Sequence, residues 1–201
     1  MSDKKSEICS KVIGVVGQNG SGKDTLIKYL DERCGLEVLS LGDVARELAH
    51  LEEAAFSRDK LHEVSQKYQE KYGEDFFIKA VIEEIESKLW EKVGVTGIRT
   101  PSEVDTLRKH FGSNFFLIHV YVDNPEVRFE RLKQRGESRD PQNYDDFLAQ
   151  EKAEKDMFRV DEAKQCADIS IANAGTLEDF HWEIDQLILQ EQFFQSLCRE
   201  A

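Results

Sequence analysis

The stretch GQNGSGKDT at residues 17–25 constrains the fold of this 201-residue chain more than any other segment. Gly17 and Gly22 are separated by four residues, and Lys23 follows the second glycine. The apolar run KVIGVVG leads into this stretch, and apolar residues repeat at helical spacing after it. A strand, a glycine-rich loop and a helix in this order are typical of a loop that binds phosphate through backbone N–H groups and a lysine. The sequence therefore favours a P-loop over an ordinary glycine-rich turn.

Short apolar runs that suit buried strands alternate with helical patterns along the chain. The strand-like runs cover 11–17, 37–43, 92–97, 115–122 and 168–175. The helical patterns cover 23–35, 44–51, 57–92 with a break at Gly73, 125–136 and 177–197. The alternation predicts an α/β fold, in which a parallel sheet of five strands is flanked by helices and binds ligands at the strands' carboxyl ends. Asp43, Arg99 and Asn173, like the glycine-rich loop, come at or just after the carboxyl ends of these strand-like runs.

Asp24 stands where most phosphate loops carry a serine or threonine that contacts Mg²⁺. The third strand usually ends in a carboxylate that holds the metal's water molecules, but here the residue is Thr96. Since Mg²⁺ accepts carboxylate oxygen readily, we expect Asp24 to supply the missing contact and the Thr25 hydroxyl to bind a phosphate oxygen. The alternative is that Asp24 only stabilises the first turn of its helix.

A second anion site is predicted beside the first. Asp43 is expected to be the N-cap of a helix, which places Arg46 in its first turn, and Arg99 directly follows the third strand. The fork of an arginine side chain can hold a phosphate at that edge of the sheet. A capped surface helix is the alternative for Asp43, and a structural salt bridge is the alternative for Arg99.

The segment 125–139 concentrates positive charge in a chain whose formal net charge is −13. Arg128, Arg131 and Arg135 share one helix face by spacing, and Arg139 follows in a loop. We expect a lid whose arginines close over the transferring phosphates and exclude water, in preference to a solvated charged face. The net charge itself argues against general nucleic-acid binding.

Length and composition predict one domain with a full core and no need of disulfide bonds. No apolar run approaches the roughly 20 residues of a membrane span. The first residues lack a signal-peptide pattern, so we expect a cytoplasmic protein without a membrane partner. The cysteines are far apart in the sequence and are expected to be reduced, mostly core-filling thiols: Cys9, Cys34, Cys166 and Cys198.

These motifs together resemble the nucleoside monophosphate kinase group of P-loop proteins. GQNGSGKDT looks like their phosphate loop, LGDVAR looks like the Gly-Asp-x-x-Arg segment of adenylate kinases, and GIR sits where their monophosphate-binding arginine follows the third strand. A closer likeness is to small proteins, common in archaea, labelled adenylate-kinase-related or dephospho-CoA-kinase-like. That likeness runs through SLGDVARELA, EKYG, GIRTPSEV, FERLKQRG and AGTLEDF.

The resemblance implies a single kinase-like P-loop NTPase domain over 1–201, with a helical acceptor-binding insertion near 43–92 and a short helical lid near 128–160. It implies Mg·ATP at residues 17–25, adenine near Asn173 and Gly175, and acceptor phosphate near Arg46 and Arg99. The lid arginines would be among Arg131, Arg135 and Arg139.

We therefore predict a Mg²⁺- and ATP-dependent phosphotransferase acting on a phosphorylated small molecule, a nucleoside or deoxynucleoside monophosphate foremost. A dephospho-CoA-type kinase and a slow regulatory NTPase acting through a protein partner are the alternatives. The predicted catalytic residues are Lys23, Arg99, Arg131 and Arg135. The predicted cofactor-binding residues are Gly17, Gln18, Asn19, Gly20, Ser21, Gly22, Lys23, Asp24, Thr25, Asn173 and Gly175. The predicted substrate-binding residues are Asp43, Arg46, Arg99 and Arg139, and the predicted metal ligand is Asp24.

The C-terminal segment carries Phe193, Phe194 and Leu197 beyond what the domain needs. Two interpretations stay open for it. The segment packs back onto the helices of the sheet, or it forms a homodimer through the C-terminal helix.

Overall fold

The centre of the molecule is a sheet of five parallel strands in the order β2-β3-β1-β4-β5. We describe a computed structural model, which covers residues 10–51 and 58–198. The strands are β1 (Lys11–Val16), β2 (Glu37–Ser40), β3 (Lys92–Ile98), β4 (Phe115–Tyr121) and β5 (Ile169–Ala172). The predicted five-stranded parallel sheet is confirmed, although β2 and β5 end earlier than the predicted runs.

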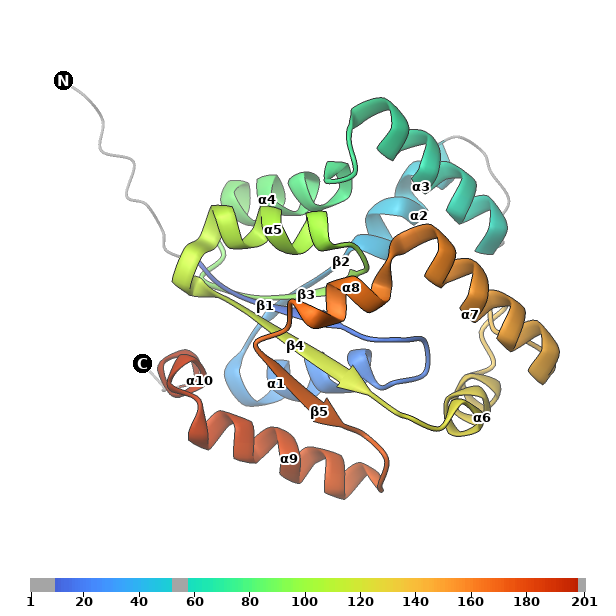
Figure 1. The fold of residues 1–201 in the computed structure, drawn as a ribbon. Coiled ribbons are helices and arrows are strands. Elements are labelled where there is room, and N and C mark those ends of the chain that lie inside the picture. The colour runs from blue at the N-terminus through green and yellow to red at the C-terminus, as the bar shows by residue number, and fades with distance from the viewer. Residues whose placement is uncertain (1–9, 52–57, 199–201) are drawn as a thin grey trace.

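Helices cover both faces of the sheet (Figure 1). One core cluster lies between the sheet and α2 (Leu41–Leu51), α4 (Phe76–Lys88), α5 (Pro101–Phe111) and α8 (Val160–Gln165). The other lies between the sheet and α1 (Lys23–Cys34), α9 (Leu177–Gln190) and α10 (Gln192–Leu197). Because strands buried on both faces need apolar residues throughout, Val12, Ile13, Val15 and Val16 of the central strand are all fully buried.

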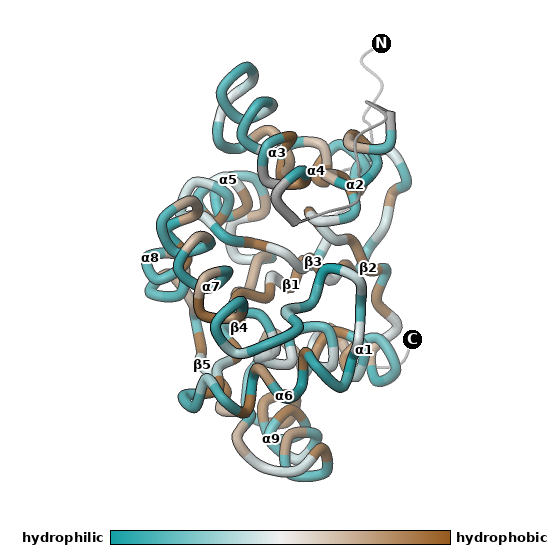
Figure 2. The backbone as a smooth tube through the Cα atoms, turned by 90° about the vertical axis from the view of Figure 1, so that its right-hand side faces the viewer, coloured by the Kyte–Doolittle hydropathy of each residue, from teal (hydrophilic) through white to brown (hydrophobic). Residues whose placement is uncertain are grey.

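Three further helices lie around the carboxyl ends of the strands. They are α3 (Arg58–Tyr72), α6 (Pro125–Arg135) and α7 (Tyr144–Phe158). A small separate cluster of Phe129, Leu132 and Phe147 joins α6 to α7. Figure 2 shows hydrophobic colouring along the central strands and hydrophilic colouring over much of α3 and α8. The predicted helices within 57–92 are confirmed as α3 and α4, and Gly73 lies at their junction.

The start of α2 differs from the prediction. The helix begins at Leu41, directly after β2, so Asp43 lies inside its first turn and is not the N-cap. A polar residue before an apolar repeat is a weak boundary signal when the strand runs into the helix without a loop. Asp43 still lies near the helix N-terminus, where a carboxylate is favoured by the helix dipole.

The C-terminal helix also differs, because two helices replace the single predicted one. Glu191 has an extended backbone (φ −87°, ψ 123°) and separates α9 from α10. The turn lets α10 fold back, so that Phe194 and Leu197 are fully buried in the core cluster beside α1 and α9. These two side chains pack back onto the domain, which is one of the two interpretations of this segment.

The prediction that the cysteines are reduced is wrong for two of them. Cys34 ends α1, Cys198 follows α10, and the two form a disulfide bond with a Cα–Cα distance of 4.4 Å. They are 164 residues apart in the sequence, so only the return of α10 to α1 brings them together. Cys166 is a free thiol, and Cys9 lies outside the described residues.

Within 10–51 and 58–198, the structure contains no helix that is both long and apolar enough to cross a membrane.

Candidate functional site

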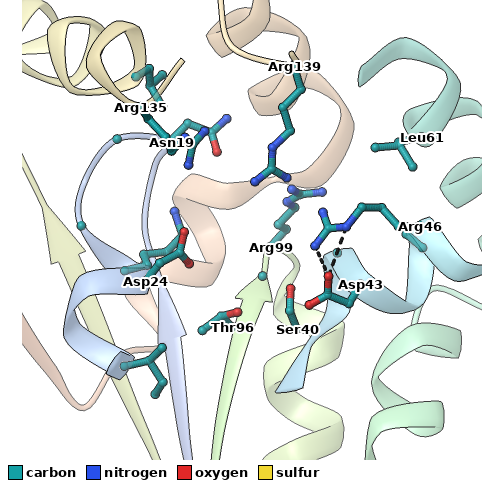
Figure 3. Close-up of a pocket in the computed structure, with 18 of the residues that line it drawn as sticks. Asn19, Asp24, Ser40, Asp43, Arg46, Leu61, Thr96, Arg99, Arg135 and Arg139 are labelled. Carbon is teal, nitrogen blue, oxygen red and sulfur yellow. Dashed lines mark hydrogen bonds and ion pairs between the residues drawn. The ribbon is translucent and has the colours of Figure 1, made fainter. Parts of the chain in front are cut away.

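A cavity of about 550 Å³ opens at the carboxyl ends of the strands (Figure 3). It brings together most of the predicted site residues: Asn19, Gly20, Gly22, Lys23, Asp24, Thr25, Asp43, Arg46, Arg99, Arg131, Arg135 and Arg139. Five others are not part of its lining: Gly17, Gln18, Ser21, Asn173 and Gly175. The cavity wall therefore contains parts of the phosphate loop (residues 17–25), of α2, of the segment after β3 and of α6 with the loop that follows.

Glycine is required in the phosphate loop at two positions where the neighbouring chain comes close. Gly20 has a φ of +75°, and a Cβ atom there would lie 2.6 Å from the backbone oxygen of Arg128. Gly22 has a φ of +101°, and a Cβ atom there would collide with the side-chain amide of Asn173. Both conformations are costly for other residues. The loop is thus fixed by α6 on one side and by the segment after β5 on the other.

Lys23 is half-buried at the base of the loop. Its Nζ atom donates a hydrogen bond to the backbone oxygen of Gln18 at 2.8 Å. Burial lowers the pKa of Lys23 to about 8, and the negative charges of Asp24 and Glu154 oppose this shift. Burial has deprived the Lys23 ammonium group of part of its hydration. The group therefore favours the binding of an anion, which would compensate for that loss.

Three buried polar atoms beside the loop find no hydrogen-bond partner in the described part of the chain. They are the Ser21 hydroxyl oxygen, Nε of Arg128 and Nη1 of Arg131. Burial also lowers the pKa of Arg131. Unpaired buried donors are costly, and a phosphate oxygen in the cavity would satisfy Nη1 of Arg131, which belongs to the cavity lining. This atom, Lys23 and the glycine loop fit a bound nucleoside triphosphate.

Asn173 supports the loop from outside the cavity. Its Nδ2 atom donates to the backbone oxygen of Ser21 at 2.9 Å, and Nη2 of Arg131 donates to its Oδ1 atom at 3.4 Å. Gly175 lies against Asp179, which belongs to the capping box of α9. Asn173 therefore fixes the shape of the loop, and its predicted contact with adenine stays a prediction.

Asp24 faces the cavity from the first turn of α1, and Thr96 lies across from it at the end of β3 (Figure 3). In the segments that the structure covers, no group of three or more His, Cys, Asp or Glu side chains could hold a metal ion. Mg²⁺ does not need such a group, because it binds through one or two carboxylates together with water and substrate phosphates. The position of Asp24 beside Lys23 fits that arrangement.

The opposite wall of the cavity carries Asp43 and Arg46 (Figure 3). Both Nε and Nη2 of Arg46 donate to the same oxygen, Oδ1 of Asp43, with Nε at 3.1 Å. The Asp43 side chain is 64% exposed and that of Arg46 is 32% exposed. Since the pair is accessible from the cavity, Arg46 can exchange this carboxylate for the anionic group of a ligand.

Arg99 enters the cavity from the segment after β3, and its backbone is held firmly. The buried Glu103 carboxylate accepts hydrogen bonds from the backbone N–H groups of Arg99 and Thr100, at 2.8 and 2.9 Å. Burial raises the pKa of Glu103, and these hydrogen bonds oppose the shift. The Arg99 guanidinium lies over the Phe158 ring, 5.0 Å from its centroid. The capping box of α5 and the aromatic ring together aim Arg99 into the cavity.

The arginines of α6 do not act as one face. Arg131 and Arg135 line the cavity, whereas Arg128 is buried and points towards α7. Nη1 of Arg128 lies 2.7 Å from Oε2 of Glu151, and the Arg128 guanidinium lies 5.3 Å from the Phe147 ring centroid. The common face that spacing predicted for these arginines is therefore corrected, because α7 packs against α6 and covers Arg128.

The two outer arginines of this region are paired with acids. Arg135 binds both oxygens of Asp140, with its Nε atom 2.9 Å from Oδ2, and Nε of Arg139 lies 2.6 Å from Oε2 of Glu137. Both arginines still border the cavity. The pairs hold the guanidinium groups near the positions that a bound phosphate would need.

The predicted helical lid near 128–160 spans α7, but sequence reasoning missed the acidic residues that α7 brings to the site. Glu154 is 8% exposed, lines the cavity and accepts a hydrogen bond from Nδ2 of Asn19 at 2.8 Å. Glu151 accepts one from Nε2 of Gln18 at 3.3 Å. The sequence signal for these residues is that Phe147, Glu151 and Glu154 share one helix face by spacing. The signal is weak, because a buried helix face is recognised by repeated apolar residues and this charged segment has few of them.

The fold is similar to that of kinases whose structures have been solved. Shikimate kinase from Acinetobacter baumannii in complex with shikimate is similar, with a TM-score of 0.57, 21% identity, and coverage of 92% of this chain and 96% of that chain. A gluconokinase from Sinorhizobium meliloti has a TM-score of 0.54 and 17% identity, with coverage of 92% and 99%. These likenesses show the fold.

Sequence comparison gives the family. A model described as an AAA domain matches residues 16–147. A UPF0200 protein of Pyrococcus horikoshii is 33% identical over 179 residues, which cover 88% of this chain and 95% of that protein. The chain therefore belongs to the UPF0200 family and carries the AAA domain, which confirms the resemblance to archaeal P-loop kinase-like proteins. It covers only 55% of a UPF0200/UPF0201 protein of Archaeoglobus fulgidus, to which it is 36% identical over 182 residues.

Proposed function

We propose that this protein is a Mg²⁺- and ATP-dependent phosphotransferase that moves the γ-phosphoryl group to a phosphorylated small molecule, a nucleoside or deoxynucleoside monophosphate foremost. The observation that carries the proposal is that one cavity joins the phosphate loop to a second set of arginines, Arg46, Arg99 and Arg139. A transferase needs two anion sites within reach of each other, whereas a protein that only binds or hydrolyses a nucleotide needs one.

Each part of the cavity has a role in this reaction. The loop N–H groups and Lys23 would bind the outer phosphates, and Asp24 would hold Mg²⁺. The bound metal would neutralise charge on the phosphates and orient them. Arg131 and Arg135 would meet the transferring group, while Arg46, Arg99 and Arg139 orient the acceptor. An acceptor phosphate is already anionic, so positioning and charge neutralisation supply most of the catalysis and no base is required.

A second candidate is transfer to a hydroxyl group, as in a dephospho-CoA-type kinase. The observation in its favour is the Asp43 carboxylate, which lines the cavity and gives only one of its oxygens to Arg46. A hydroxyl acceptor has a proton to lose, and Asp43 could accept it. In this candidate Arg99 and Arg46 would hold another anionic group of the same acceptor.

The test is transfer of labelled γ-phosphate from ATP with Mg²⁺ to nucleoside and deoxynucleoside monophosphates and to dephospho-CoA, beside an acceptor-free control. A labelled monophosphate product supports the first proposal, and a labelled hydroxyl product supports the second. Release of phosphate at a rate that no acceptor alters would contradict both, and would favour a regulatory NTPase that acts through a protein partner.

We also propose that residues 1–201 act as one domain in the cytoplasm, with the helices near 43–92 on the acceptor side and 128–160 as the lid. A homodimer through the C-terminal helix stays a prediction.

A further inference from the structure

Two carboxylates of α7 hold the tip of the phosphate loop. Glu154 accepts a hydrogen bond from the side-chain amide of Asn19 at 2.8 Å, and Glu151 accepts one from that of Gln18 at 3.3 Å. The two acids are three residues apart, so both face the loop from neighbouring turns of α7.

The location of Glu151 explains why α7 stays in place. Its Oε2 atom also lies 2.7 Å from Nη1 of Arg128; the Arg128 side chain is 4% exposed and that of Glu151 is 14% exposed. The aromatic contact between Phe129 and Phe147 joins the same two helices. Glu151 is therefore an anchor between α6 and α7, and it does not line the cavity.

Glu154 has a different environment, because it lines the cavity in which phosphate is expected. It is 8% exposed, and its negative charge acts on Lys23, the cation of the phosphate loop. Asp24 is the other acid that raises the pKa of Lys23, whereas the positive charges of Arg99 and Arg135 lower it. A buried carboxylate in a cavity bordered by five arginines competes for the same cations as a phosphate would.

A metal-binding role explains Glu154 less well. The Asn19 side-chain amide donates directly to the Glu154 carboxylate and holds it at the loop. A carboxylate that accepts a hydrogen bond from the loop stands where an anionic ligand would accept one, so we treat Glu154 as an anion at the loop and not as a metal ligand.

We propose that Glu154 is a built-in competitor of the nucleotide: in the nucleotide-free protein its carboxylate occupies the anion-binding side of the phosphate loop, and a bound triphosphate displaces it. This inference rests on the proposed function, because it requires ATP at the loop. Displacement of Glu154 would also break the hydrogen bond between Asn19 and α7. Binding of ATP would thereby loosen α7, the helix that follows the lid arginines in the sequence.

The test is the affinity for ATP of wild-type protein and of Glu154→Gln, measured by calorimetry with Mg²⁺. Glutamine keeps an oxygen that can accept from Asn19 but removes the charge, so we expect ATP to bind about tenfold more tightly or better. The gain should be smaller for ADP, which brings less negative charge to the loop. Asp156→Asn is the matched control, because Asp156 lies on the same helix, is exposed and is not part of the cavity lining; its affinity should equal that of wild type.

Thermal melting of each variant shows whether it is folded, and Glu154→Ala is a second variant with the same expected gain. Unchanged or weaker ATP binding in both Glu154 variants, with clear binding by wild type, would overturn the competitor role alone. Absence of ATP binding by every one of these folded proteins would overturn the proposed function and the competitor role together.

Discussion

The two halves of the cavity are held in different ways. The donor half (residues 17–25 with Arg131) is fixed by backbone: Gly20 and Gly22 have no room for a side chain, and Asn173 binds the loop from behind. The acceptor half (Asp43, Arg46 and Arg99) presents side chains, two of which form an accessible pair with each other. The Arg99 backbone there is held by the buried Glu103 carboxylate at the start of α5.

This difference indicates which part of a ligand each half can select. A loop made of backbone N–H groups recognises phosphate whatever the rest of the molecule is. A wall of long side chains can rearrange around acceptors of different shape, at a cost in conformational entropy. We therefore expect changes in the donor half to abolish transfer, and changes in the acceptor half to alter mainly the affinity for the acceptor.

The largest effect is expected for Lys23→Met. The variant removes the cation that reaches the outer phosphates, so transfer should fall by about 10³-fold or more. Initial rates of labelled phosphate transfer measure the effect. Lys28→Met, on the exposed side of the same helix, should keep the wild-type rate. A Lys23→Met enzyme within tenfold of wild type would show that the loop is not the donor site.

Asp24→Asn is expected to lower the rate of Mg²⁺-dependent phosphate transfer by about 10²-fold, because an amide is a much weaker ligand for a hard cation than a carboxylate. ATP binding without Mg²⁺ should be unchanged or tighter, and this second readout separates metal binding from folding. Glu32→Gln in the exposed last turn of α1 is the control. Unchanged turnover in Asp24→Asn would restrict Asp24 to stabilising the first helical turn.

The affinity for ATP should depend on pH through Lys23, whose pKa in the free protein is lowered to about 8. Only the ammonium form attracts phosphate, so Lys23 adds no dependence below pH 8. As the pH rises above 8, the free protein loses this proton and the affinity should fall by up to about tenfold per unit. Calorimetric titrations between pH 7 and 9.5 test this, and the slope should vanish in Lys23→Met. A flat profile for wild type would contradict the role of the ammonium group.

The smallest effect is expected for Asp43→Asn with a phosphate acceptor. Because that acceptor needs no base, kcat should change by less than about threefold. With a hydroxyl acceptor, loss of the base would lower kcat by about 10²-fold or more. The kcat of this variant therefore separates the two candidate reactions. A large fall in kcat with a monophosphate acceptor would contradict a purely binding role for the acceptor half, and would place Asp43 in the chemical step.

The difference between the halves also explains how much the sequence could predict. The glycine loop and the apolar strands carry local signals, since a φ above zero needs glycine and a strand buried on both faces needs an apolar run. The five strands, their parallel direction and the position of Arg99 followed from those signals.

The features that were missed depend on tertiary contacts. Helix α7 lies within the predicted lid near 128–160, but its sequence is too polar to indicate a buried face, so Glu154 was not predicted. Arg128 is buried only because Glu151 meets it from another helix. The Cys34–Cys198 disulfide exists because α10 turns back after Glu191, where neither glycine nor proline marks the end of α9.

The central claim is that donor and acceptor occupy separate halves of one cavity, and two-substrate kinetics of Arg99→Ala test it most directly. With the acceptor identified by the transfer screen, we predict that KM for the acceptor rises about 10- to 100-fold while KM for ATP stays within about twofold of wild type. Arg33→Ala, which removes an arginine on the far side of α1, should change neither constant. An equal rise in both KM values, or no change in either, would contradict the division of the cavity into a donor half and an acceptor half.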